Sequence, residues 1–457
     1  MPLWMCDFEN CCRPAVRKSG DCLLCNRHLC SIHLLPSHHT CPQWKDEDAY
    51  DPAAGVAKEN ELEALIARIN IRALEDKATH LRQGISCSIN PLTSHDVNSL
   101  MGGMNCHVEI RFSDGMIWIA RIRRSNSKSP SPAVRDYIIQ SEVATLKFLH
   151  QTNVPVPKVF DFALEQPGNP VGVGFILMEK LQGKALQWDS TTLEQKKKVM
   201  QQMTDIFIEL HRYPFTLLGS FNNNGTSSGP QVGAIAHELL MDFEHSKMRT
   251  IGPFSCPEQY HYSLLQKILN MIVQEEMYSQ VAVDAYLIHR FLIDLVPLVT
   301  SSCSQNSDTF FYLRHTDDKG DHILVDQDFN ITGIIDWEWA QTAPAFQAFK
   351  SPTGFLPVQE FYDGSNDLGD DEIVFARLFE EKGRQDLADC VWKGRLQHRF
   401  EFCCGYDLED WDGFVGLFQG LRDAAAVDQG LEWEEWKVVA LQRYKDDSGL
   451  QQLLSKG

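Results

Sequence analysis

Two acidic segments of the chain carry side chains that could act together on a phosphate group. Residues 315–326 read HTDDKGDHILVD, and residues 334–340 read IIDWEWA. An enzyme that transfers a phosphoryl group needs one carboxylate to position the acceptor hydroxyl and further ligands to hold magnesium between the nucleotide phosphates. Asp317 suits the first role, and Asp336 suits the second.

A hairpin is the element that would bring these two aspartates together. Ile323–Val325 and Ile331–Ile335 are apolar, and the turn-like residues 326–330 separate them. One aspartate would then precede the first strand, and the other would follow the second strand.

A second hairpin is predicted upstream, where residues 100–124 read LMGGMNCHVEIRFSDGMIWIARIRR. Gly102 and Gly103 precede two alternating strands that are joined by a turn at Ser113–Gly115. A glycine pair before a hairpin allows backbone amides to approach phosphates. Arg121, at the end of the second strand, would then reach the phosphates, although taken by itself it is typical of a surface arginine.

The elements after this hairpin occur in the order found in a kinase amino-terminal lobe. Residues 133–151 have helical spacing and offer Glu142 as a partner for Arg121. The proline-rich residues 154–157 cannot continue the helix, and the apolar strand at Val171–Met178 leads into a short connector.

Eight ordered motifs carry a family resemblance: GGMN, SDGMIWIARI, SEVATLKFL, VPVPKV, FILMEKLQGK, IELHRYPF, HTDDKGDHILVD and GIIDWEWA. They resemble the aminoglycoside phosphotransferase and protein-kinase-like superfamily, in particular its large fungal branch, from about Met101 to Phe402. The resemblance implies an α+β, bilobal protein-kinase-like fold. Residues 96–182 would form a small β-rich N-lobe, and residues 183–457 a mostly helical C-lobe whose helices build the acceptor pocket.

The resemblance also implies roles for individual residues. Asp317 would be the catalytic base, His315 would brace the catalytic loop, and Asp336 would be a magnesium ligand. Arg121 stands at the usual phosphate-contacting lysine, and Glu142 would be its partner. The remaining nucleotide-binding positions are the two glycines and the adenine hinge: Gly102, Gly103, Met178, Glu179 and Lys180.

Three positions depart from the family pattern. His322 stands where the family has a metal-binding asparagine, and an imidazole suits magnesium less well than manganese, a softer ion. Asp318 and Asp321 are alternative oxygen ligands. Arg121 keeps the positive charge of the usual lysine but not its point-like geometry. The loop of the form LHPGN is replaced here by DKGDH.

The amino-terminal segment carries the spacing of a metal site. Of the fourteen cysteines, seven lie in the first 41 residues, and crowding of this kind in a chain without a secretory signal indicates metal rather than disulfides. Eight thiols and imidazoles are enough for two tetrahedral zinc sites in a segment that has too little core to fold without them. These residues are Cys6, Cys11, Cys22, Cys25, Cys30, His33, His39 and Cys41.

Residues 1–44 resemble the AN-one class of zinc finger, in which alternate ligand pairs share a metal. The resemblance implies one zinc on Cys6, Cys11, Cys30 and His33 and the other on Cys22, Cys25, His39 and Cys41. Cys12 and His38 are alternatives to their sequence neighbours Cys11 and His39. Because protein would fill every position, both zinc ions would be structural. The module would staple the fold or bind a protein partner.

Residues 45–95 are predicted to join this module to the lobes. The polar residues 45–55, KDEDAYDPAAG, are typical of a linker, and residues 57–77 have the spacing of an amphipathic helix whose apolar face packs on a neighbouring domain.

Composition excludes several classes of protein. The net charge of −20 argues against nucleic acid as the main partner, because phosphate binding draws on an excess of lysine and arginine. No run of about 18 apolar residues predicts a membrane span, and residues 1–7 lack a secretory pattern, so we expect a cytoplasmic protein that could also be nuclear. The aromatic and acidic run Tyr406–Asp412 is either a solvated loop or a surface that faces a cationic acceptor.

Together these features predict an ATP-dependent phosphotransferase that acts on the hydroxyl of an unidentified small molecule. Its cofactors would be ATP, Mg²⁺ or Mn²⁺, and two Zn²⁺ ions. Two alternatives remain: a nucleotide-binding pseudokinase, motivated by His322, and a scaffold whose zinc finger in residues 1–44 binds a protein partner.

Overall fold

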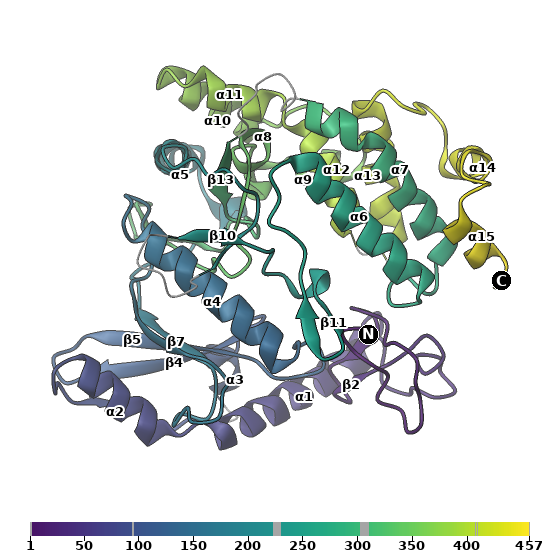
Figure 1. The fold of residues 1–457 in the computed structure, drawn as a ribbon. Helices are drawn as coiled ribbons and strands as arrows, with labels where there is room; N and C mark the ends of the chain where they lie inside the picture. Colours follow the sequence, from purple (N-terminus) through teal and green to yellow (C-terminus); the bar gives the residue numbers. More distant parts are fainter. Residues whose placement is uncertain are drawn as a thin grey trace.

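The chain forms two lobes and a small cysteine-rich module at the amino terminus (Figure 1). The computed structural model describes most of the 457 residues, and the described ranges are 2–93, 96–222, 230–301, 310–406, 408 and 410–456. The predicted α+β, bilobal fold with a sheet-based N-lobe and a helical C-lobe is confirmed. No helix in these ranges has the length and apolar character needed to cross a membrane.

The N-lobe is built on a five-stranded antiparallel sheet. In spatial order its strands are β3 (Cys87–Ser88), β4 (Asn105–Phe112), β5 (Ile117–Arg123), β7 (Phe175–Glu179) and β6 (Val159–Ala163). The predicted hairpin is formed by β4 and β5, and Gly115 at its turn has a φ of +89°, which favours glycine. Side chains alternate along β5, so Ala120 and Ile122 enter the core. Arg121 and Arg123 face the boundary between the two lobes, which is called the cleft below.

Helices cover both faces of this sheet (Figure 1). On the cleft side lies α4 (Pro132–Leu149), which packs on β6 and β7. The other face is covered by α1 (Glu47–Arg68) and α2 (Ile71–Leu81), whose fully buried Leu62 and Leu74 join the core of the sheet, and the short α3 (Val97–Leu100) lies beside β4. The apolar side chains predicted to share one face in residues 57–77 are thus buried against the sheet.

The prediction of a linker at residues 45–55 is wrong, because α1 begins at Glu47. Asp46 accepts a hydrogen bond from the Ala49 N–H at 3.4 Å, and acidic residues occupy the first turn, where the helix dipole favours them. The polar composition is compatible with a helix here, because Asp46 caps its start and Glu47 and Asp48 lie in its first turn.

The single helix predicted at residues 57–77 is two helices. The chain is extended at Ile69, and the Asn70 side chain accepts a hydrogen bond from the Ala73 N–H at 3.1 Å, which starts α2. Residues 45–95 thus belong to the N-lobe, to which they also contribute the edge strand β3.

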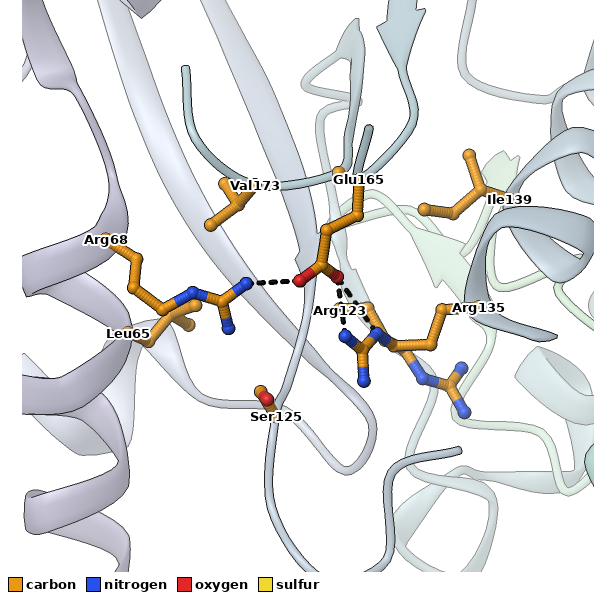
Figure 2. A pocket seen from close by; sticks show the side chains of 9 residues that line it. Leu65, Arg68, Arg123, Ser125, Arg135, Ile139, Glu165 and Val173 are labelled. Carbon is orange, nitrogen blue, oxygen red and sulfur yellow. Dashed lines mark hydrogen bonds and ion pairs between the residues drawn. The ribbon is translucent and has the colours of Figure 1, made fainter. Parts of the chain in front are cut away.

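One carboxylate fastens α1 to the N-lobe. Glu165 lies between Arg68 of α1, with which it forms an ion pair, and Arg135 of α4, whose Nη2 is 2.6 Å from Glu165 Oε2 (Figure 2). The void beside them measures about 10 Å³, room for about one water molecule, so this group is structural.

The C-lobe consists mostly of helices, as predicted for the region after Phe346. They are α5 (Leu193–Leu210), α6 (Pro257–Val273), α7 (Ala282–Thr300), α8 (Ala345–Ala348), α9 (Val358–Tyr362), α10 (Asp370–Glu381), α11 (Gln385–Trp392), α12 (Arg395–Gly405), α13 (Trp411–Ala424), α14 (Trp433–Arg443) and α15 (Ser448–Leu454). One apolar core joins α4, α5, α10 and α11, and a second joins α6, α7 and α12 to α15.

Short antiparallel strand pairs carry the loops of the cleft. They are β13 (Phe311–Arg314) with β16 (Gln341–Pro344), β14 (Ile323–Val325) with β15 (Ile331–Ile334) and β8 (Lys184–Ala185), β9 (Ser220–Asn222) with β10 (Gln231–Gly233), and β11 (Asp242–Glu244) with β12 (Lys247–Arg249). The predicted hairpin is β14–β15, with Ile323 opposite Ile334. Asp326 closes its turn by accepting the Asn330 N–H at 2.8 Å. This hairpin brings the segments of Asp317 and Asp336 side by side.

Candidate active site

A buried arginine joins three parts of the cleft. Arg121 of β5 forms ion pairs with Glu142 of α4 and with Asp336, and its Nη2 is also 3.0 Å from Glu338 Oε2. Arg121 is 7% and Glu142 3% exposed, so these charges interact with little screening by solvent. The structure thus brings together the Arg121–Glu142 pair and Asp336 that the sequence singled out.

Two partners in this cluster escaped the sequence analysis. Glu338 is paired with Arg123 as well as Arg121, and it accepts a hydrogen bond from Asn105 Nδ2 at 2.9 Å. A signal for Arg123 was present, because residues two apart on a strand share a face and Arg121 was already placed in the cleft. Glu338 had no such signal, since its segment is irregular.

Asp336 itself has an unusual backbone conformation. Its φ is +65°, in the left-handed region that residues other than glycine rarely adopt. Its side chain is half exposed. The next residue, Trp337, is buried, and its Nε1 donates to Ile334 O at 3.0 Å. This anchor holds the strained position and turns the Asp336 carboxylate toward the cleft, where Arg121 contacts it.

Hydrogen bonds fix the loop of Asp317 against the loop of Asp336. His315 Nε2 donates to Ile335 O at 2.9 Å, and Thr316 Oγ1 donates to Trp339 O at 3.0 Å. Asp317 lies between these anchors and the Lys319 side chain, whose Nζ is 2.9 Å from Asp317 Oδ1. The Asp317 side chain is 28% exposed, so its carboxylate is accessible from the cleft.

His322 is stacked on His315 with ring centroids 4.1 Å apart. Burial lowers the pKa of both imidazoles, that of His322 well below its usual range, so the stacked pair is neutral. The Gly320 N–H donates to His322 Nδ1 at 3.3 Å, which leaves the ring proton on Nε2. In this tautomer His322 presents no lone pair to a metal ion.

The alternative oxygen ligands are placed differently. Asp318 accepts a hydrogen bond from Thr353 Oγ1 at 2.5 Å, whereas Asp321 is exposed. In the described part of the chain, ligand atoms of three or more Cys, His, Asp or Glu residues come within 4.8 Å of one another only in the amino-terminal module. Asp317, His322 and Asp336 therefore do not form a closed metal-binding group here, and Arg121 holds Asp336 instead.

The predicted glycine pair lies in the short loop between α3 and β4. The Arg124 Nη1 donates to both Gly102 O and Gly103 O at 2.9 Å, and Arg124 is paired in turn with Glu61 of α1. An added Cβ at Gly103 would meet nothing within 4 Å, so the space beside this backbone is open. The helix that covers the sheet thus also fixes the glycine loop.

The predicted hinge residues lie at the exit of β7. Met178 is buried in the core shared by the two lobes, and the Glu179 N–H donates to Lys158 O at 2.9 Å. Lys180 forms an ion pair with Glu109 of β4. Arg121 is paired in register with Ile176, two residues before Met178, so the hinge and the arginine cluster lie on neighbouring strands.

A cavity of about 390 Å³ opens beside Asp317 in the C-lobe. Its wall comes largely from α6 and α12 and includes Tyr260, His261, Leu264, Phe400 and Glu401. Burial opposes ionisation of Glu401, but the charges of Arg314 and Lys350 outweigh it and hold the pKa of this carboxyl at about 2. The negative charge of Glu401 in this wall is therefore neutralised by Arg314 and Lys350.

The run at Tyr406–Asp412 is only partly described. Asp407 and Glu409 lie outside the described residues. Tyr406 Oη donates to Asp410 Oδ2 at 2.5 Å, and Asp410 also caps α13 by accepting the Gly413 N–H. Of the two described carboxylates in this run, Asp410 is engaged in a helix cap, and Asp412 is exposed in the first turn of α13.

We expect the buried imidazole of His261 to make stability depend on pH. Burial lowers its pKa from 6.5 to about 4, so the unfolded chain binds more protons between these values and stability falls as the pH falls from 6.5 toward 4. Between pH 7 and pH 5 the wild type should lose about 2 kcal/mol more than His261→Gln, measured by urea unfolding. The exposed His80→Gln should follow the wild type, and equal losses in all three proteins would contradict this expectation.

The amino-terminal module contains β1 (Asp21–Cys22) and β2 (Arg27–His28) and two groups of metal-ligating side chains. The ligand atoms within each group lie within 4.8 Å of one another, and the groups are Cys6, Cys11, Cys30 and His33, and Cys22, Cys25, His39 and Cys41. This is the division that the resemblance implied.

The geometry of these groups fits zinc. The Sγ atoms of Cys11 and Cys30 are 3.9 Å apart, close to the separation of about 3.8 Å between two thiolates bound tetrahedrally at about 2.3 Å. Cys25 Sγ lies 3.7 Å from His39 Nε2 in the second group. The alternatives Cys12 and His38 lie outside both groups.

Metal analysis of the purified protein is expected to find two zinc ions per chain. Cys11→Ser should reduce this number to about one and lower the stability of the module, because zinc binding supplies folding free energy to segments of this size. Cys12→Ser is the matched control, since its thiol is exposed and outside the group, and it should keep both ions. Loss of zinc from Cys12→Ser, or none in the wild type, would contradict the assignment.

Comparison with known proteins yields a family match across the cleft. The model of the phosphotransferase enzyme family matches residues 118–347, half of the chain. The range runs from β5 through the Asp317 and Asp336 loops.

Two fungal proteins are similar in sequence. The clavilactone A biosynthesis cluster protein Y of Ampulloclitocybe clavipes is 25% identical over 363 residues, which are 76% of this chain and 82% of that protein. A subtelomeric hrmA-associated cluster protein of Aspergillus fumigatus is 30% identical over 167 residues. That match covers 35% of this chain and only 29% of the Aspergillus protein.

Similar solved structures are more distant. The aminoglycoside phosphotransferase APH(4)-Ia is 14% identical, with a TM-score of 0.45 over 79% of this chain and 99% of that one. A putative fructosamine-3-kinase from Thermobifida fusca is 12% identical, with a TM-score of 0.46 over 78% and 99% of the two chains. The sequence match spans the elements that carry the Arg121 cluster and both aspartate loops, and the chain belongs to the phosphotransferase enzyme family.

Proposed function

We propose that the protein is an ATP-dependent phosphotransferase that acts on the hydroxyl group of a small molecule. The observation that carries this proposal is the buried Arg121, which joins Glu142 to Asp336 at the base of the cleft. Arginine in this place can neutralise nucleotide phosphates. A cavity of about 390 Å³ adjoins Asp317, so there is also room for an acceptor.

The proposed reaction follows from these positions. The acceptor hydroxyl oxygen forms a bond to the γ-phosphorus as the bond from that phosphorus to the β–γ bridging oxygen breaks. The proton of the hydroxyl passes to the Asp317 carboxylate, and the products are a nucleoside diphosphate and a phosphate monoester. Lys319, whose Nζ lies 2.9 Å from Asp317 Oδ1, would move aside or contact the transferred group.

Asp336 would hold the divalent cation that the nucleotide brings. When bound, that cation neutralises charge on the β- and γ-phosphates. The half-exposed Asp336 carboxylate fits this role, provided that Arg121 shifts from it to the phosphates. For the second ligand, Asp321 is exposed, and His322 would need the other ring tautomer.

A nucleotide-binding pseudokinase is the second candidate, and one observation favours it. His322 Nδ1 accepts the Gly320 N–H, so the position that is usually a metal-binding asparagine is occupied by a structural hydrogen bond. A scaffold role through the zinc module is a third candidate.

Thermal unfolding with and without nucleotide tests the proposal. ATP with Mg²⁺ or Mn²⁺ should raise the Tm by several degrees, because a ligand at 100 times its Kd stabilises the folded state by about 2.7 kcal/mol. Asp336→Ala should remove the metal-dependent part of this rise, whereas Asp328→Ala in the exposed hairpin turn should not. Absence of any rise with either metal would refute nucleotide binding.

A further inference from the structure

The zinc module is docked firmly against the rest of the chain. The guanidinium of Arg17 is 3.0 Å from Glu276 Oε2, and the two side chains are 1% and 6% exposed. Arg17 Nη1 also donates to Leu239 O at 2.9 Å. Breaking a buried ion pair of this kind is costly, so the module is held in one position against the segment that follows α6.

The module also reaches the N-lobe. Leu3 is packed with Val134 and Ile138 of α4 and with Met241 in a small apolar cluster. In Figure 1 the module lies near the N label, between α1 and the lower ends of α6 and α7. It therefore bridges the two lobes on one side of the cleft instead of hanging from a linker.

A large cavity lies between the module and the two lobes. It measures about 920 Å³, and its wall includes Leu23 and Trp44 from the module, Met104 from the N-lobe and Trp411 from the C-lobe. It shares six wall residues with the smaller cavity beside Asp317: Lys18, His237, Leu239, Met277, Tyr278 and Trp339. The two cavities are thus neighbours across a common wall, and Trp339 is part of the segment that follows Asp336.

We propose that the two cavities together form one acceptor site, with the zinc module as its outer wall. The acceptor would be an extended, largely apolar and aromatic molecule that places a hydroxyl at Asp317 and its remaining part against Leu23, Trp44 and Trp411. This inference rests on the proposed phosphotransferase function, which it deepens by naming the class of acceptor.

The size and the apolar character of the walls support this class. Each of the two cavities falls within the range of about 300–1,000 Å³ that is usual for sites of drug-sized molecules, which are lined mostly by apolar and aromatic side chains with a few polar groups. Trp44 is 55% exposed, so its ring is available to contact a molecule in this cavity. The tryptophans Trp4, Trp44, Trp339 and Trp411 all line the larger cavity.

The charge of the walls argues against a polycationic acceptor. The whole chain has 62 acidic and 42 basic residues, yet the described wall residues are not predominantly acidic. The carboxylates among them are Asp21, Glu238, Asp317 and Glu401, and the basic residues are Arg17, Lys18, Lys45, Lys128 and Arg314. Glu401 is neutralised by Arg314, and Glu238 contacts Arg123 and accepts the Trp339 Nε1–H at 3.0 Å. A cation would find few free carboxylates in these walls.

Binding of two probes to the full zinc-loaded chain tests the inference. N-phenyl-1-naphthylamine, a neutral aromatic dye, should bind saturably with increased fluorescence, and Trp44→Ala should weaken its binding about tenfold, as expected for loss of an aromatic anchor. Trp392→Ala is the matched control, because Trp392 lies on α11 outside both cavities and should leave the affinity unchanged. Hygromycin B, a polycation, should not displace the dye.

The possible failures are distinguishable when ATP-dependent stabilisation is measured on the same samples. Normal stabilisation by ATP without saturable dye binding, or dye binding that is insensitive to Trp44→Ala, would overturn the inference and leave the proposed function in place. Displacement of the dye by hygromycin B would overturn the apolar class of acceptor. Trp44-dependent dye binding without any response to ATP would refute the phosphotransferase proposal and, with it, the assignment of the cavities as an acceptor site.

Discussion

Asp317→Asn is expected to lower phosphoryl transfer by about 10²–10⁴-fold, the usual contribution of a general base. Asparagine keeps the size of the side chain but cannot accept the proton of the acceptor hydroxyl. Since Asp317 contacts only Lys319 among the charged groups of its loop, the fold and the ATP-dependent rise in Tm should persist. The rate is measured as ADP release with water or an added hydroxyl compound as acceptor.

Asp328→Asn is the control for this experiment, because Asp328 lies exposed in the turn between β14 and β15. It should release ADP at the wild-type rate. A wild-type protein that binds ATP but releases ADP no faster than Asp317→Asn would favour the pseudokinase.

Arg121→Met is expected to produce the largest loss of stability, about 3–5 kcal/mol in urea unfolding. The reason is that Glu142, which is 3% exposed, would stay buried beside a neutral side chain, and Glu338 would keep only Arg123 as its partner. Nucleotide-dependent stabilisation should also disappear, because the phosphates would lose their buried positive charge. Thermal unfolding with ATP and a divalent cation measures the second effect.

Two further variants serve as controls for Arg121→Met. One restores the positive charge at residue 121, and the other removes an exposed arginine elsewhere on the sheet. Arg121→Lys keeps the positive charge that the family usually provides, so it should recover most of the response to ATP. Arg111→Met, near the end of β4, removes a half-exposed arginine whose ion pair with Glu109 is open to solvent, and it should cost less than about 1 kcal/mol. If Arg121→Met kept both stability and the response to ATP, the cluster could not carry the proposed function.

Under the proposed function, the amino-terminal module would take part in selecting the acceptor. In the structure the buried Arg17–Glu276 pair holds the module beside the Asp317 cavity, so loss of zinc would remove a wall of the site as well as a folded segment. A chelator should therefore weaken dye binding more than ATP binding. A role as a wall of the cavity would account for where the module lies. A separate scaffold role is not needed to explain this.

The sequence by itself determined the parts that depend on local spacing. The β14–β15 hairpin follows from apolar residues around a polar turn, and it brings the segments of Asp317 and Asp336 side by side. The close spacing of cysteines and histidines likewise limits how eight ligands can form two groups of four. The order of strand and helix made Glu142 available as a partner for Arg121. The roles of the two residues were implied by the family resemblance.

Only the tertiary structure decided the contacts between distant segments. The partners Glu338, Arg123 and Asn105 meet across more than 200 residues, and Arg17 meets Glu276 across 259, so no local periodicity announces them. The polar residues 47–55 are helical because the cap at Asp46 and the packing of the rest of α1 on the N-lobe outweigh a linker-like composition. The cavity under the zinc module exists because buried contacts fix that module between two lobes, and a cavity between separate segments leaves no spacing pattern in a sequence.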